Sequence, residues 1–277
     1  MIGSNPFAEL SSLIPQSAMQ TYVIIMIALV VVGVVLDLIH KKSATYFFQN
    51  AEKAQQNRKK DLTDSDKFSI ATQTLLVDVL TSGEFYNQKR RIAHMCKMLG
   101  FIIFMVTTLL LIFSAETSPM VAVLWHLGAA SVSAGGLYFW FYLRVNGSSE
   151  GQSWSTVVKG DAFILSLIGT TLFGLIWSYL QSSGSSLTMA AFSLFLLSAT
   201  VLFGGVRWSK FAHMFFKPAA AYQKRVAQAD GSNENLPELG ELTDPALQKQ
   251  FPDIPEYMGS NPPNMGLGIK REAPRHY

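Results

Sequence analysis

Long apolar runs without charge alternate with short polar segments along this chain. A transmembrane helix needs about 20 apolar residues at a rise of 1.5 Å each, and five runs reach that length. We predict spans at about residues 22–39, 98–115, 119–143, 162–181 and 187–206. The last two lie in one uncharged stretch that a serine-rich sequence divides. The pattern predicts an all-α integral membrane protein with a bundle of five transmembrane helices.

The polar segments define the remaining organisation. We predict a short external tail at residues 1–19, a membrane domain at 20–215 and a cytoplasmic tail at 216–277. The tail holds most of the prolines and no periodic apolar pattern, so it is either disordered or an extended arm laid over a partner protein. Within the connection 41–97, residues 67–80 carry apolar residues at helical spacing and predict an amphipathic helix. Such a helix lies on the membrane, against a partner, or packed as a connector.

Every basic side chain falls on one side of this topology. The connection 41–97 holds 11 Lys and Arg, the segment 144–161 holds two, and residues 207–277 hold nine, which together are all 22. Loops rich in Lys and Arg stay in the cytoplasm. Alternating spans therefore predict an external N-terminus and a cytoplasmic C-terminus, in a bacterial inner membrane.

Composition excludes several classes of function. Hydrophobic residues make up 49% of the 277 residues and charged residues only 15%, against about 25% charged in soluble domains, so the chain is not a soluble multidomain enzyme. A single cysteine, Cys96, allows no disulfide within the chain and no four-cysteine cluster. No acidic residue lies deep in a predicted span, which argues against a transporter built on intramembrane carboxylates.

Histidine is the residue type left for chemistry. His94 precedes the second span and His213 follows the fifth, so both imidazoles lie at the cytoplasmic membrane surface. Two imidazoles facing each other across a bundle can hold a six-coordinate b-type haem. The neighbouring Arg91 and Lys210 could then pair with the haem propionates. The alternative is two ordinary interfacial histidines among positive-inside residues.

His126 lies within the third span, about 13 Å from the outer surface. It has no second histidine at that depth, so it cannot form a bis-histidine site within this chain. A polar contact between helices is one interpretation of it, and a hydrogen bond to a quinone is the other.

Three ordered motifs resemble a known family. They are Arg90-Arg91-Ile92-Ala93-His94-Met95 leading into Gly100-Phe101 and Thr107-Thr108, Trp208-Ser209-Lys210-Phe211-Ala212-His213-Met214 with Lys217-Pro218, and Val77-Asp78-Val79-Leu80-Thr81-Ser82-Gly83-Glu84-Phe85. Together they are similar to the di-haem cytochrome b family of the nitrate reductase gamma subunit, over about residues 40–220. Within it, they resemble the membrane subunits of sulfur metabolism: the adenylylsulfate reductase membrane anchor and the C subunit of the quinone-interacting membrane-bound oxidoreductase. The resemblance implies five spans with the N-terminus outside.

The chain departs from that family in two respects. It lacks the ferredoxin-like region whose cysteines bind iron–sulfur clusters in the C subunit, which favours the stand-alone anchor. Family spacing also implies outer-haem ligands at Phe104 and Phe195, where this chain has apolar rings. The resemblance therefore implies one cytoplasmic-side haem at most, held by His94 and His213, and it puts direct quinone chemistry in doubt.

These observations lead to one functional expectation with two rivals. We expect a membrane anchor and electron-transfer subunit that connects a cytoplasmic iron–sulfur and flavin oxidoreductase, adenylylsulfate reductase by resemblance, to the quinone pool. In sulfur oxidisers the implied direction is from sulfite and AMP toward quinone. The first rival is a structural anchor of the same complex without a cofactor. The second is a small transporter or channel component, which is supported only by the number of spans and by the position of His126 within one of them.

Overall fold

The computed structural model describes residues 2–41, 43–83, 87–144, 155–207, 211, 213–232 and 243–250. These residues form helices joined by turns, and none of them lies in a strand. The chain divides into two compact units, which we describe separately. The first comprises Met1–Phe47 and Thr72–Ala221, and the second comprises Phe48–Ala71 and Tyr222–Tyr277. The prediction of an all-α membrane protein is confirmed at this level, because four helices are long and apolar enough to cross a membrane.

The four long helices of the first unit match predicted spans. They are α2 (Gln16–Lys41), α5 (Gln88–Phe113), α6 (Pro119–Tyr138) with its π-helical extension η2 (Phe139–Leu143), and α8 (Ala162–Ser182) after the short η3 (Lys159–Asp161). The fifth predicted span is the apolar helix α9 (Thr188–Gly204), whose 17 residues place it at the lower limit for crossing a bilayer. Both α2 and α5 extend beyond the predicted apolar limits, since a helix continues into polar sequence where its backbone bonds are satisfied.

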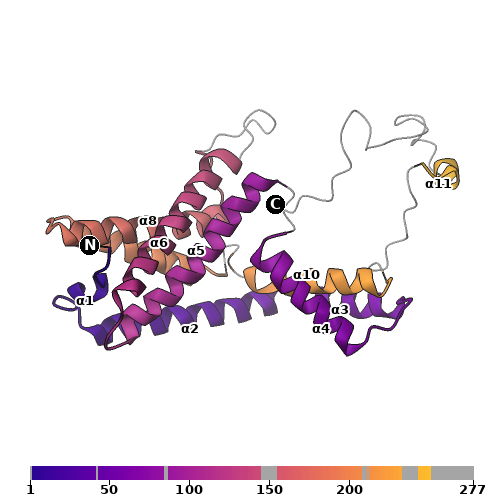
Figure 1. Ribbon diagram of the computed structural model, residues 1–277, viewed down its shortest axis with the longest axis horizontal. Coiled ribbons are helices and arrows are strands. Elements are labelled where there is room, and N and C mark those ends of the chain that lie inside the picture. Colours follow the sequence, from indigo (N-terminus) through magenta and orange to yellow (C-terminus); the bar gives the residue numbers. More distant parts are fainter. Residues whose placement is uncertain are drawn as a thin grey trace. The chain divides into compact units, whose positions relative to one another are not determined.

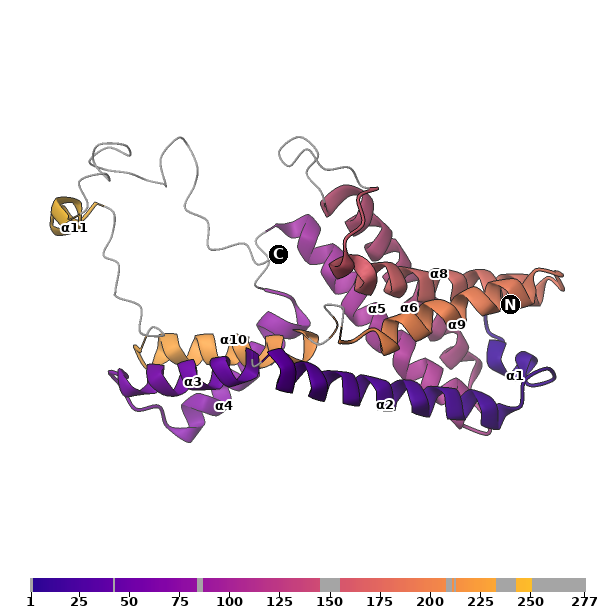
Figure 2. The same cartoon turned by 180° about the vertical axis from the view of Figure 1, so that it is seen from behind.

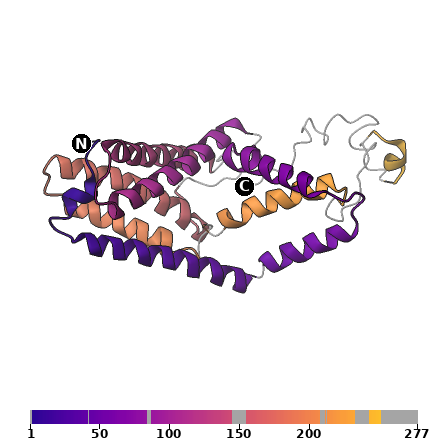
Figure 3. The same ribbon diagram turned by 60° about the horizontal axis from the view of Figure 1, so that its bottom comes forward.

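Consecutive helices of this unit pack side by side. α5 packs along α6 and α6 packs on α8 (Figure 1), and α8 packs along α9 (Figure 2). α2 lies against α9, as Figures 2 and 3 show from two directions, and makes a smaller contact with α5. Its long exposed apolar face, including Ile24, Val31 and Ile39, is suited to lipid.

Two glycines let α5 and α6 approach closely. A Cβ atom on Gly128 would lie 2.8 Å from the Phe104 backbone nitrogen and 2.9 Å from the Gly100 carbonyl oxygen. A Cβ atom on Gly100 would in turn lie 2.9 Å from the Gly128 carbonyl oxygen. Small residues at such crossings allow backbones to pack without intervening side chains, as is common between membrane helices.

We expect Gly128→Ala to destabilise the protein by about 1–3 kcal/mol, the usual effect of overpacking. The added methyl group meets backbone atoms, which cannot rotate away, so α5 and α6 must separate. Gly204→Ala in α9 is the matched control, because its Cβ would meet nothing closer than Leu29 Cδ1 at 3.9 Å. Thermal unfolding of both variants in one detergent measures the difference, and equal midpoints would show that this crossing tolerates a methyl group.

The N-terminal segment is folded onto the bundle, although the sequence predicted only a short external tail. Asn5 caps the helix α1 (Pro6–Leu10), and its side-chain amide donates a 3.0 Å hydrogen bond to the Leu111 carbonyl at the end of α5. The Gln181 amide donates to the Pro6 carbonyl at 2.8 Å. Phe7 is buried edge-on against Trp125 and Trp177. These contacts cover the end of the helix bundle formed by the C-terminal ends of α5 and α8.

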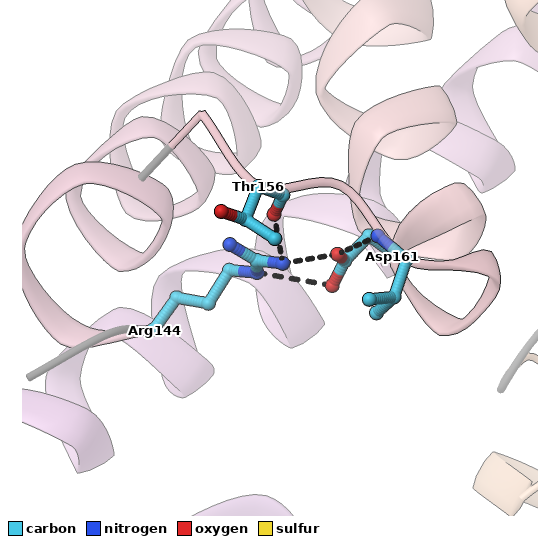
Figure 4. A network of polar contacts seen from close by, with 4 residues as sticks. Arg144, Thr156 and Asp161 are labelled. Carbon is cyan, nitrogen blue, oxygen red and sulfur yellow. Dashed lines mark hydrogen bonds and ion pairs between the residues drawn. The ribbon is translucent and has the colours of Figure 1, made fainter. Parts of the chain in front are cut away.

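An ion pair joins the end of η2 to the start of α8. Arg144 Nε donates to Asp161 Oδ1 at 3.0 Å, and Nη2 donates to Asp161 Oδ2 (Figure 4). Nη2 also donates to the Thr156 carbonyl at 2.7 Å, and the guanidinium lies 4.2 Å above the Trp140 ring. The two charged side chains are only 11% and 14% exposed. A bidentate ion pair that is largely removed from solvent thus links the two ends of the connection between α6 and α8.

The second unit holds polar helical segments. They come from α3 (Ser43–Gln56), α4 (Asp64–Gln73), α10 (His213–Ala229) and α11 (Pro245–Gln250). The amides of Lys59 and Lys60 donate to the Asp230 carbonyl at 2.8 and 3.1 Å, which joins the end of α10 to the α3–α4 connection. Hydrogen bonds from the Thr63 hydroxyl and amide lower the pKa of the Asp66 carboxyl in the first turn of α4. α10 shows that the predicted tail begins as a helix.

Candidate functional site

His94 lies in the second turn of α5. That helix begins after Asn87, whose side-chain oxygen accepts hydrogen bonds from the amides of Lys89 and Arg90. This N-cap satisfies amides that have no partner within the helix. His94 Nδ1 lies 2.9 Å from the hydroxyl oxygen of Ser82, which comes before the helix. The predicted ligand is therefore fixed by a specific side-chain hydrogen bond.

Ser82 has an unusual backbone conformation. Its φ of +50° is in the left-handed region that non-glycine residues rarely adopt, and its side chain is 1% exposed. Such a conformation costs on the order of 1–3 kcal/mol and persists only where neighbouring contacts hold it. A strained, buried serine aimed at an imidazole indicates a positioning role for its hydroxyl group.

Contacts on both sides of Ser82 hold it in place. Arg91 Nε donates to the Thr81 carbonyl at 2.7 Å. The Thr81 hydroxyl and the Gly83 amide both donate to the Val77 carbonyl, at 2.7 and 2.8 Å. A Cβ atom on Gly83 would lie 2.9 Å from Val77 Cγ1, so the turn depends on glycine there. Arg91, the predicted propionate partner, thus binds this turn through its Nε–H. A guanidinium has five N–H donors, so this one hydrogen bond does not prevent Arg91 from also donating to a propionate.

The hydrogen bond to Ser82 has a chemical consequence for His94. When Nδ1–H donates to the serine oxygen, the lone pair of the neutral ring is on Nε2. That tautomer is the one in which histidine binds a metal through Nε2, and a partner on the other nitrogen orients the ring. The geometry at His94 is therefore suited to an axial ligand.

The second predicted ligand is described only through its backbone. His213 is the first residue of α10, and its side chain lies outside the described residues. Lys210, the predicted propionate partner, also lies outside them. Two residues before His213, Phe211 is 3% exposed and belongs to the core of the first unit.

An apolar crevice of about 420 Å³ lies between α2, α5 and α9. Its volume falls in the range of about 300–1,000 Å³ that is typical of ligand pockets. The lining is almost wholly hydrocarbon, and aromatic rings dominate the walls formed by α5, α9 and the segment after α9. These rings are Phe101, Phe104, Phe192, Phe195, Phe203, Phe211 and Phe215. The sequence did not predict this crevice, because its walls come from helices far apart along the chain.

By helical spacing, His94 shares the face of α5 that lines the crevice, and Phe101, two turns later, is the first residue of α5 in that lining. Phe101 and Thr108 both line the crevice, and they follow His94 at intervals of seven residues, which return to nearly the same helix face. Phe101 also meets Phe211 edge-on, with ring centroids 6.5 Å apart. The helix that carries His94 and the segment that leads to His213 therefore meet at one end of the crevice, which the predicted orientation makes the cytoplasmic end.

At the end of the crevice away from His94, the walls are packed aromatic rings. Phe104 is 2% exposed and lies 5.2 Å from Trp125, between ring centroids. Phe195 stacks on Trp177 at 5.6 Å. The positions at which the family resemblance implies outer-haem ligands are thus part of the hydrophobic core.

His126 connects two helices through both of its nitrogens. Nδ1 lies 2.7 Å from the Ala122 carbonyl oxygen one turn earlier in α6. Nε2 lies 2.8 Å from the hydroxyl of Ser178 in α8. This arrangement favours the first interpretation of His126, a polar contact between helices, over a quinone ligand.

The most informative residue of the site was not singled out from the sequence. Ser82 stands before a glycine in a loop, which is ordinary turn composition, and its contact with His94 depends on the folded turn. Across the part of the chain that the structure describes, no group of three or more His, Cys, Asp or Glu side chains could hold a metal ion. A bis-histidine haem needs only two imidazoles, so it remains compatible with this observation.

No protein-family model, no curated protein and no solved structure matches this chain.

Proposed function

We propose that this chain is the membrane anchor and electron-transfer subunit of a cytoplasmic oxidoreductase, and that it binds one b-type haem through His94 and His213. The observation that carries the proposal is the 2.9 Å contact between His94 Nδ1 and Ser82, a buried residue in a strained conformation. A hydroxyl fixed in this way prepares Nε2 as a ligand. The motifs around the two histidines, which resemble the nitrate reductase gamma family, support the same assignment.

The proposed topology has five spans, with the N-terminus outside and the C-terminus in the cytoplasm of a bacterium. α9 would be the fifth span, because 17 apolar residues are within the range of transmembrane helices. The one-sided distribution of all 22 Lys and Arg supports the orientation. In this topology His94 and His213 lie at the cytoplasmic surface, where a soluble electron carrier can reach them.

The residues at the cytoplasmic level fit a haem. His94 faces the crevice by helical spacing, and aromatic rings such as Phe101 and Phe211 provide the apolar walls that a macrocycle needs. Arg91 and Lys210 are the proposed propionate partners. A b-type haem supplies reversible one-electron transfer. The contribution of the protein is to orient the imidazole, exclude water and supply positive charge.

The residues at the outer level do not fit a second haem. Phe104 and Phe195 offer no ligand atom, and both pack against tryptophans. We therefore propose one haem per chain. His126 is not part of the proposed quinone path, because its two nitrogens already contact Ala122 and Ser178.

We propose that the partner is an iron–sulfur and flavin enzyme, most directly adenylylsulfate reductase, whose electrons reach the quinone pool through this subunit. The proposal of this partner rests on the resemblance. The segment 41–97 on the cytoplasmic side, with 11 Lys and Arg against six Asp and Glu, would supply a surface for docking an acidic partner.

A cofactor-free anchor of the same complex is the second candidate. One observation favours it: Phe104 and Phe195 stand where the family resemblance implies the two ligands of the outer haem, and both rings are buried in the core. The absence of one haem is thus already compensated by side-chain packing. In that case His94 and Ser82 form only a structural contact at the start of α5.

A visible spectrum of the purified chain tests the proposal. We expect a dithionite-reduced minus air-oxidised spectrum with a b-type α-band, and pyridine extraction near one haem per chain. The protein must be expressed with adequate haem supply and recovered folded. Folded protein without haem would reject the cytochrome and leave the cofactor-free anchor as the function.

A further inference from the structure

The π-helix η1 (Thr74–Leu80) exposes large apolar side chains. Leu75 is 54% exposed, Leu76 is 51% exposed and Leu80 is 39% exposed. A π-helix closes bonds between residues five apart, so Leu75 and Leu80 lie about one turn apart with Leu76 beside them. The helix has one charged residue, Asp78, which is half-buried. Exposed leucines gathered on a short helix outside the predicted spans indicate a surface that is covered in the native environment.

Two hydrogen bonds fix the depth of this surface within the first unit. Thr81 and Ser82, which follow η1 directly, contact Arg91 and His94 of α5 at 2.7 and 2.9 Å. At 1.5 Å per residue, His94 and Arg91 lie about 6 Å and about 10 Å before Met98, where the apolar run of α5 begins. The headgroup layer is about 5–8 Å thick on each side of a bilayer. The turn that ends η1 therefore lies within the headgroup layer at Ser82 and at the aqueous edge of that layer at Thr81.

Charge near η1 also suits a lipid surface. Lys89, in the first turn of α5, is exposed at the same end of that helix. The cytoplasmic leaflet carries anionic lipids that attract such basic residues close to the membrane.

We propose that η1 is an interfacial membrane helix, whose Leu75, Leu76 and Leu80 insert at the headgroup–acyl boundary of the cytoplasmic leaflet. Helices of this kind bury their apolar face about 5–10 Å into that boundary. The bilayer then holds the turn that contains Ser82 against α5. This inference requires the membrane-spanning α5 but not the haem, so the two proposals can fail separately.

Spin labelling of the full chain in nanodiscs of phosphatidylcholine and phosphatidylglycerol tests the inference. Leu76→Cys and, independently, Leu80→Cys are labelled in a Cys96→Ala background, and collision rates with oxygen and a water-soluble nickel chelate are measured. We expect an oxygen-to-nickel ratio above unity at both positions. Lys60→Cys, in the exposed polar segment after α3, is the control and should favour nickel.

Two results would overturn the inference. Nickel access at both leucine positions, equal to that at Lys60→Cys, would place η1 in water. Protection from both reagents would show that protein covers the leucines, as in a dimer of this chain. Unchanged helicity and a single size-exclusion peak are required of each variant, and the second leucine position allows a conclusion if one variant misfolds.

Discussion

His94→Ala is expected to abolish the b-type absorbance of the purified chain. A six-coordinate haem needs an imidazole on each face, and no histidine other than His94 and His213 is proposed at this level. Because His94 is only half-buried at the start of α5, its removal should leave the helices assembled. Pyridine extraction and circular dichroism of the same preparation measure haem and fold together.

The matched control for this prediction is His40→Ala. His40 also lies at the end of a long helix, α2, that the charge distribution predicts to be cytoplasmic, and it is exposed. Haem content should remain at the wild-type level in that variant. If His94→Ala retains a full complement of haem, His94 is not a ligand and its contact with Ser82 is structural.

Ser82→Ala is expected to weaken haem binding in the same experiment without abolishing it. The substitution keeps a Cβ atom at the strained φ of +50° and removes only the hydroxyl that contacts Nδ1. Loss of such a partner typically weakens metal binding 10–100-fold. The ring also becomes a weaker donor, so the midpoint potential of any retained haem should rise. An unchanged potential would exclude a positioning role for Ser82.

Arg144→Met is expected to destabilise the membrane domain by about 3–5 kcal/mol, as removal of one partner of a buried ion pair does. Asp161 would keep its charge at 14% exposure without the guanidinium that donates to both of its oxygens. The Thr156 carbonyl and the Trp140 ring would lose their contacts as well. Thermal unfolding in detergent measures this loss.

A second Arg–Asp pair in the chain supplies the comparison. Arg58 Nε lies 2.8 Å from Asp61 Oδ1, but the side chains are 54% and 81% exposed. Solvent-exposed pairs contribute roughly 0–1 kcal/mol, so Arg58→Met should barely change the unfolding midpoint. The double substitution Arg144→Met/Asp161→Leu should recover part of the loss by removing the unpaired charge. Equal effects of Arg58→Met and Arg144→Met would show that burial of the Arg144–Asp161 pair has no energetic consequence.

Local properties of the sequence predicted the long helices. A span depends on the length and polarity of one continuous segment, so the apolar runs at 98–115, 119–143 and 162–181 could be identified without tertiary information. The amphipathic pattern at 67–80 likewise predicted helix, which the structure divides into α4 and η1. The orientation and the pair of ligand histidines stay predictions from the distribution of charge and from the motifs.

The tertiary structure decided which distant residues meet. Three features join segments that no local pattern relates. They are the packing of α1 against the ends of α5 and α8, the crevice between α2, α5 and α9, and the Arg144–Asp161 pair. The same is true of Ser82, whose positive φ and contact with His94 arise only when the turn after η1 folds against α5. The sequence by itself determined which segments suit a membrane, because that depends on each segment alone. The environment of His94 required the fold, because a hydrogen bond depends on distances between segments that are separate along the chain.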